Sequence, residues 1–150
     1  MPGFLELVAE LPRRRCGLGE VVIEQGAPAT ALLVLLEGGV EVMRDDVRVA
    51  RAAEPGAVFG EMSVLLGGPC TATVRTISPS VFAVIADPAA FLRASPGASL
   101  HVAVLLARRL EALNRYLIDV KQQYEGHDHL GMVDDVLDTL MHRQPRTPPK

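Results

Sequence analysis

Short hydrophobic segments separated by turn-forming residues run through residues 18–86. Four valines alternate with polar residues on either side of Asp45-Asp46, and this period of two predicts a β-hairpin. Other strands are predicted at residues 21–23, 32–36, 71–77 and 81–85. Glycine and proline punctuate these segments at a spacing of about 8–12 residues, which favours a sandwich, barrel or jelly roll.

The pattern changes to helical spacing at the beginning of the chain and after residue 87. A short amphipathic helix is predicted at residues 4–11, with the basic triplet 13–15 as its solvated end. Further helices are predicted at residues 88–93, 96–125 and 130–142. The long helix begins at Ser95-Pro96 and stops at Gly126. We expect residues 1–125 to form one domain, and residues 126–150 to form a short helix and a disordered tail.

The long predicted helix carries a heptad pattern of hydrophobic residues. They follow a 3-4 spacing and are Ala103, Leu106, Leu110, Leu113, Leu117, Val120 and Tyr124. About three repeats is near the minimum for a coiled coil. A helix that packs along its own domain more often shows a wider stripe with a period of 3.6. The pattern therefore favours a homodimer through this helix, with packing on the chain's own β domain as the alternative.

Composition narrows the class of protein further. The chain has 150 residues, a net charge of −3, 49% hydrophobic and only 4% aromatic residues. This size suits one domain with an aliphatic core that needs neither metal nor disulfide. The acidic balance provides no electrostatic surface for nucleic acid. No apolar run reaches the roughly 18 residues of a membrane span, and no signal peptide is expected. Two cysteines without paired spacing indicate reduced thiols in the cytoplasm.

One segment, residues 59–74, has the composition of a binding turn. A strand is expected to end at Phe59, and Gly60 permits a tight turn or the close approach of a ligand. Glu61 then begins a short apolar turn, and glycines and Pro69 return the chain to a strand. Backbone N–H groups exposed in such a turn bind anions, and a nearby carboxylate accepts hydrogen bonds from sugar hydroxyls. A plain β corner without a ligand is the alternative.

Several motifs in this order resemble the cyclic nucleotide-binding domain family, over about residues 4–125. They are Gly19, Gln25-Gly26, Leu36-Glu37-Gly38, Pro55-Gly56, Phe59-Gly60-Glu61, Pro69 and Thr71-Ala72-Thr73-Val74, followed by a long helix. The resemblance implies a mainly β fold with flanking helices (α+β). It is an eight-stranded β jelly roll with a short N-terminal helix, a phosphate-binding-cassette helix and a long C-terminal helix.

The resemblance also implies a ligand and the residues that bind it. Glu61 would hold the ribose 2′-hydroxyl, backbone amides of the short helix would bind the cyclic phosphate, and Thr71 would add a hydroxyl contact. The implied ligand-binding residues are Phe59, Gly60, Glu61, Met62, Ser63, Pro69, Cys70, Thr71 and Ala72. Leu113 and Asn114 on the long helix are candidates to cap the base, since Asn114 can hydrogen-bond a purine. cAMP is the default ligand of the family.

The sequence departs from the family at residue 70. The family has an arginine there that pairs with the phosphate, whereas this chain has Cys70. A charge-assisted hydrogen bond contributes about 1.5–3 kcal/mol, or roughly 10- to 150-fold in affinity. Arg75 is expected on the opposite face of its strand, as a solvated residue that does not replace the missing cation. Without an arginine, the charge of Glu61 opposes an anionic ligand.

The sequence therefore favours a non-enzymatic, cytoplasmic, dimeric sensor that binds a cyclic nucleotide and signals through its long helix. A separate effector protein is a possible partner that would receive this signal in trans. The alternative is a degenerate, non-binding domain that acts as a dimerisation or docking scaffold. No catalytic motif, cofactor motif or metal site is predicted, and His127 and His129 are expected to be ordinary polar loop residues. Residues 126–150 are too few and too acidic for a DNA-binding domain.

Overall fold

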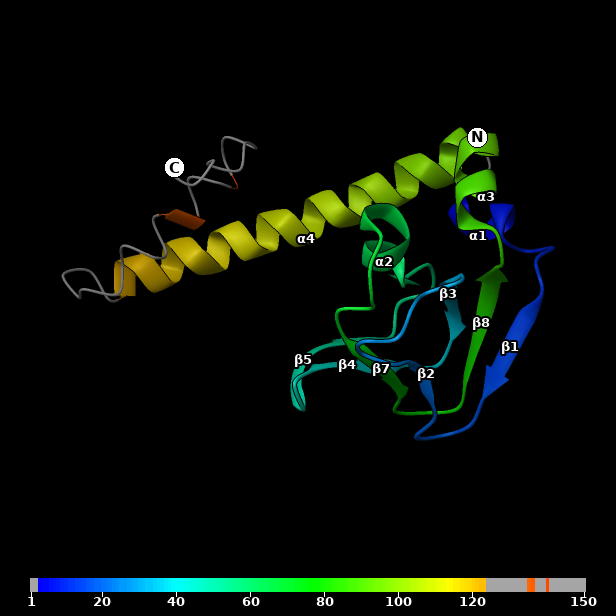
Figure 1. Cartoon of the computed structure of the whole chain (residues 1–150), viewed down its shortest axis with the longest axis horizontal. Coiled ribbons are helices and arrows are strands. Elements are labelled where there is room, and N and C mark those ends of the chain that lie inside the picture. Colours follow the sequence, from blue (N-terminus) through cyan, green and yellow to red (C-terminus); the bar gives the residue numbers. More distant parts are fainter. Residues whose placement is uncertain (1–2, 124–134, 137–139, 141–150) are drawn as a thin grey trace. The chain divides into compact units, whose positions relative to one another are not determined.

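The computed structural model describes residues 3–123, 135–136 and 140. Within residues 3–123 the chain forms eight strands in two four-stranded antiparallel sheets, with helices at both ends and one between β6 and β7 (Figure 1). This is the mainly β jelly roll with flanking helices that the sequence predicts. The helices are α1 (Phe4–Leu7), α2 (Glu61–Leu66), α3 (Pro88–Ala94) and α4 (Pro96–Gln123).

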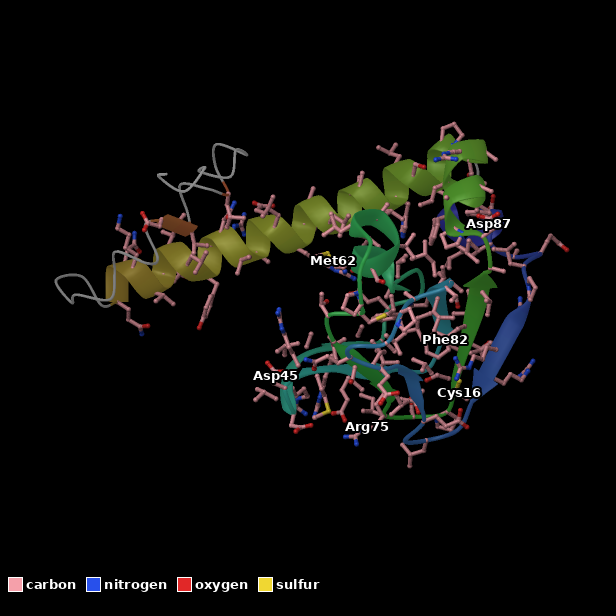
Figure 2. The ribbon with its side chains drawn as sticks, viewed as in Figure 1. Cys16, Asp45, Met62, Arg75, Phe82 and Asp87 are labelled. Carbon is pink, nitrogen blue, oxygen red and sulfur yellow. The ribbon has the colours of Figure 1, made fainter. Side chains whose placement is uncertain are left out.

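The first sheet has the order β1-β8-β3-β6, and its inner strands β8 and β3 are buried on both faces. Its strands are β1 (Arg13–Cys16), β8 (Ser80–Ile85), β3 (Leu32–Glu37) and β6 (Val58–Phe59). Leu35, Phe59 and Phe82 lie in the core between the sheets, where the two phenylalanine rings meet edge to face at 6.5 Å (Figure 2). Alternate residues such as Leu32 and Val34 are also buried, so this sheet has a core on its other face as well.

Val8, which follows α1, and Ala98 and Val102 of α4 are buried. The ring of His101 on α4 stacks on Phe4 of α1, with centroids 3.7 Å apart. Its Nε2 donates a hydrogen bond to the carbonyl oxygen of Gly56 at 3.0 Å. These contacts anchor the first turns of α4 to the jelly roll, and Figure 1 shows α1, α3 and the start of α4 together.

The second sheet has the order β2-β7-β4-β5. Its strands are β2 (Val21–Ile23), β7 (Thr73–Thr76), β4 (Val40–Arg44) and β5 (Val47–Ala52). The predicted hairpin is confirmed, because β4 pairs with β5 across Asp45 and Asp46. Both aspartates have positive φ, 50° and 63°, as a type I′ turn requires. Val40 and Val74 of this sheet join the core between the sheets.

Two predictions for the start of the chain are wrong in detail. The first helix is shorter than predicted, at Phe4–Leu7. The basic triplet is not a helix end but part of β1, where Arg13, Arg14 and Arg15 pair with Ala83, Phe82 and Val81. β1 is an edge strand, and charged residues are common on such strands because one side faces solvent. The triplet therefore lacks the hydrophobic alternation that marks a more buried strand.

Contacts divide the chain into two compact units, residues 1–102 and 103–150, and α4 begins in the first unit and continues in the second. Among the described residues, no single helix has the length and hydropathy of a membrane span. The helices α3 and α4 meet these two criteria of length and composition only when they are taken together, and the pair is bent by 109°. Tyr124 and most of the predicted helix at 130–142 lie outside the described residues, as do the tail, His127 and His129.

Candidate functional site

The turn between β6 and β7 has the local structure that its sequence predicts. β6 ends at Phe59, Gly60 has φ 92°, and the six residues Glu61–Leu66 form α2. A Cβ atom on Gly60 would lie 3.1 Å from the carbonyl oxygen of Ala31. Glycine is therefore needed at residue 60 both for its positive φ and for the close approach of the backbone at Ala31. This approach places α2 directly against the loop between β2 and β3.

The side chains at the start of α2 alternate between buried and exposed positions. Glu61 and Ser63 are each only 7% exposed, whereas Met62 is 42% exposed. The hydroxyl of Ser63 donates a hydrogen bond to the carbonyl oxygen of Gly68, and it accepts one from the N–H of Ala29 at 3.4 Å. Ser63 therefore ties α2 to the chain on both sides of it. Glu61 has its carboxyl group inside the protein at the start of the helix.

Residue 70 is held through its main chain rather than its side chain. The N–H of Cys70 donates to the carbonyl oxygen of Ala27 at 2.8 Å, and its own carbonyl oxygen accepts from the N–H of Gly26 at 2.8 Å. A bridge between Pro28 and Pro69 extends this pairing. The Cys70 thiol is buried at 7% exposure. These bonds fix residue 70 against the loop between β2 and β3 whatever side chain it carries.

The structure thus brings together most of the predicted ligand-binding residues. Residues 59–63 and 69–72 flank one turn, and the loop at 26–31 pairs with both sides of it. Thr71 is exposed and Ala72 is half-buried. Sequence reasoning missed the contribution of Ala27 and Ala29, whose backbone groups hydrogen-bond to the turn, and of Ala31, whose carbonyl oxygen closely approaches Gly60. Only the neighbouring Gln25-Gly26 motif indicated that this loop matters.

The predicted base-capping residues and the heptad residues from Ala103 to Val120 lie on α4, in the second compact unit. Leu113 is 45% exposed and Leu110 is 38% exposed. Asn114 is half-buried, and its Oδ1 atom is buried without a hydrogen-bond partner among the described residues. Leu106, Leu117 and Val120 are half-buried, and Ala103 is exposed.

A pocket of about 230 Å³ opens beside Cys70 on the side of β1 and β2. Most of its lining is small or aliphatic, and its charged groups are Arg14 and Glu24. The lining residues are Arg14, Val22, Ile23, Glu24, Ala27, Pro28, Ala29, Thr30, Ala31, Leu33 and Cys70. We call it the Arg14 pocket. An arginine and a cysteine from distant parts of the sequence therefore share one cavity.

Two other charged or reactive groups fall outside this arrangement. Arg75 donates from Nε to Glu41 Oε1 at 2.9 Å, and its Nη2 pairs with the same oxygen. Arg75 is exposed, as expected of a solvated strand residue, and it is paired with Glu41 across the strands of the second sheet (Figure 2). Burial raises the pKa of the Cys16 thiol, although the nearby Arg14 acts in the opposite direction. No cluster of three metal-ligating side chains occurs among the described residues.

The site is thus a short helix between β6 and β7 of a two-sheet jelly roll, closed against the loop between β2 and β3. The model of the cyclic nucleotide-binding domain family matches residues 13–93 of the chain. The chain belongs to this family. The matched residues include all eight strands, α2 and most of α3.

Two curated proteins illustrate the sequence relationship. The chain is 32% identical over 75 residues to a cAMP-dependent protein kinase regulatory subunit of Yarrowia lipolytica, covering 50% of this chain and 20% of that protein. It is 34% identical over 84 residues to the acetyltransferase Pat of Mycolicibacterium smegmatis, covering 53% of this chain and 25% of that protein. The chain thus spans only about a fifth to a quarter of the length of these relatives.

Solved structures show the same fold. The catabolite activator protein of Thermus thermophilus superposes with a TM-score of 0.63 at 23% identity, over 92% of this chain and 80% of that one. The sensor domain of the transcriptional regulator DNR of Pseudomonas aeruginosa gives a TM-score of 0.55 at 26% identity, over 70% of this chain and 78% of that one. A cyclic nucleotide-binding domain from Methylobacillus flagellatus gives 0.60 at 23% identity, over 83% and 84%.

Proposed function

We propose that this chain is a regulatory module that binds cAMP at the turn between β6 and β7 and acts by binding rather than by catalysis. The observation that carries the proposal is the closed turn itself: Gly60 and Glu61 stand in the family's order, Glu61 is buried at the start of α2, and Ser63 fixes α2 to the neighbouring loop. A buried carboxylate at this place is suited to accept hydrogen bonds from ribose hydroxyls.

In this proposal the ligand contacts come from both sides of the turn. Glu61 receives the 2′-hydroxyl of the ribose, and main-chain N–H groups of residues 60–63 and Thr71 face the phosphate. Phe59 and Ala72 supply apolar surface, and Leu113 or Asn114 of α4 covers the base, from the same chain or from a dimer partner. The exposed heptad residues of α4 support a homodimer through this helix, which would carry the signal to an effector. The two free cysteines support a cytoplasmic location.

The proposal is tested by titrating cAMP into the wild-type chain and into Cys70→Arg, with binding followed by calorimetry. Wild type is expected to bind, and Cys70→Arg to bind about 10- to 150-fold more tightly, because a guanidinium adds a charge-assisted hydrogen bond to the phosphate. The fold should tolerate the change, since the hydrogen bonds of residue 70 to Gly26 and Ala27 use only its main chain.

A second variant is Glu61→Gln, which keeps the size of the side chain but removes its charge. It is expected to weaken cAMP binding while leaving the melting temperature of the free protein within a few degrees. The comparison of cAMP with cGMP in the same titration identifies the base. Absence of heat for both nucleotides at high micromolar concentration, in wild type and Cys70→Arg alike, would contradict the proposed function.

A further inference from the structure

Arg14 lies on the inner face of its sheet, although the arginines on either side of it do not. Arg14 pairs directly with Phe82 across the β1–β8 ladder, and residues paired in this way project from the same face. Phe82 is fully buried in the core between the sheets. Arg13 and Arg15 alternate to the other face. Because β1 is an edge strand, the Arg14 side chain is exposed rather than buried in the core, and from this face it lines the Arg14 pocket.

The guanidinium of Arg14 interacts with the Cys16 thiol and with one main-chain carbonyl group, and it has no carboxylate partner among the described residues. Its Nη1 lies 3.5 Å from the carbonyl oxygen of Val22, which is longer than the usual 2.9–3.0 Å of an N–H···O bond. The side chain lines the Arg14 pocket, so it can turn its donors toward the cavity. An arginine offers up to five donors in a planar fork that matches a phosphate or a carboxylate.

The Arg14 pocket adjoins the proposed ligand site at Gly60. Three of its lining residues, Ile23, Ala29 and Ala31, are also the residues that a Cβ on Gly60 would meet, at 3.6, 4.0 and 3.1 Å. Cys70 lines the same pocket, and its short side chain leaves free the space that a longer side chain would fill. The cavity therefore connects the place of the missing cation with a cation from another strand. Glu24 lines the pocket too, and its side chain is exposed, as that of Arg14 is.

We propose that Arg14 supplies the positive charge for the phosphate of the ligand, in place of an arginine at residue 70. This inference rests on the proposed function, because it names the cation of the same site. The guanidinium would enter between β1 and the loop at 26–31, whereas a side chain at residue 70 would enter from the start of β7. Binding in this chain would then depend on a residue of β1.

The test compares cAMP affinities of wild type, Arg14→Ala, Arg15→Ala and the double variant Arg14→Ala/Cys70→Arg. Arg15→Ala removes the same charge from the neighbouring, outward-facing position of β1 and should bind like wild type. Arg14→Ala is expected to bind cAMP at least about tenfold more weakly than wild type. The double variant should recover the cAMP affinity that Arg14→Ala loses. Adenosine, which has no phosphate, serves as the second ligand, and its affinity should be the same for wild type and Arg14→Ala.

The outcomes of this experiment distinguish the role of Arg14 from the proposed function. Equal cAMP affinities for Arg14→Ala and Arg15→Ala, with wild type binding, overturn the role of Arg14 and leave the proposed function intact. An equal loss of adenosine and cAMP affinity in Arg14→Ala also overturns it, because the residue would then act on structure rather than on phosphate. Absence of cAMP binding in wild type overturns the proposed function and the role of Arg14 together.

Discussion

At the scale of single residues, Cys70 shows that the geometry of the turn and its charge are set by different atoms. The main chain of residue 70 is bonded to Gly26 and Ala27, so the turn keeps its shape without an arginine side chain. The charge, in contrast, depends on the side chain alone. A substitution here can therefore change affinity by orders of magnitude and leave the fold intact.

Glycines show the reverse case, in which a missing side chain sets the fold. Gly38 and Gly26 have nearly the same φ, 92° and 87°. A Cβ on Gly38 would lie 2.4 Å from the carbonyl oxygen of Pro79, whereas nothing lies within 4 Å of one on Gly26. Gly26→Ala should therefore lower the free energy of unfolding by about 1–2 kcal/mol through backbone strain alone. Gly38→Ala should lower it by more, or prevent folding. Urea denaturation measures both, and equal losses would contradict the steric argument.

At the scale of elements, the β4–β5 hairpin places two aspartates in the left-handed region. Asp45 is tied to Gln25 by two hydrogen bonds of 2.8 and 2.9 Å, one through its carboxylate and one through its N–H. Asp46, at φ 63°, has no such side-chain hydrogen bond within the part of the chain that the structure describes. The two positions therefore have similar backbone geometry but different side-chain roles.

This difference makes the hairpin a test of turn chemistry. Asp46→Gly should raise the free energy of unfolding by about 0.5–1 kcal/mol, because Asp-Gly suits a type I′ turn better than Asp-Asp. Asp45→Gly relieves the same strain but removes the carboxylate bond to Gln25, so it should give little or no gain. Chemical denaturation of wild type and both variants measures these free energies of unfolding. A larger gain from Asp45→Gly would mean that the bond to Gln25 contributes nothing.

The elements also show what the sequence alone can predict. The hairpin, the buried strand β3 and the turn at Gly60 are predictable, because alternation, an apolar run and a glycine each act locally. β1 was missed since its pairing with β8 joins residues far apart in the chain, and its arginines carry no apolar alternation. The same reason hid the Arg14 pocket. It forms only when β1, the loop at 26–31 and residue 70 come together, and no local pattern records that contact.

At the scale of the whole molecule, the first unit and the continuation of α4 serve different purposes in the proposed mechanism. α4 is anchored to the jelly roll at His101 and Val102. Beyond that point its heptad residues are exposed or half-buried within the chain. Exposed leucines at a coiled-coil spacing are an unfavourable surface for an isolated helix, and pairing with a second copy would bury them. A sensor and a non-binding scaffold would both use such a helix, but they differ in its response to ligand.

The last prediction separates these two roles. Leu113→Asp places a charge on the heptad face of α4, and Ala112→Asp places the same charge one residue away, outside it. Sedimentation at several concentrations should give a dimer for wild type and Ala112→Asp and a monomer for Leu113→Asp. For a sensor, cAMP shifts the dimerisation constant of wild type, because a ligand that favours one placement of α4 must change the equilibrium that α4 controls. A dimer unaffected by cAMP, in a chain that binds no nucleotide, would instead identify a scaffold. A wild-type monomer at all concentrations would contradict the homodimer in either role.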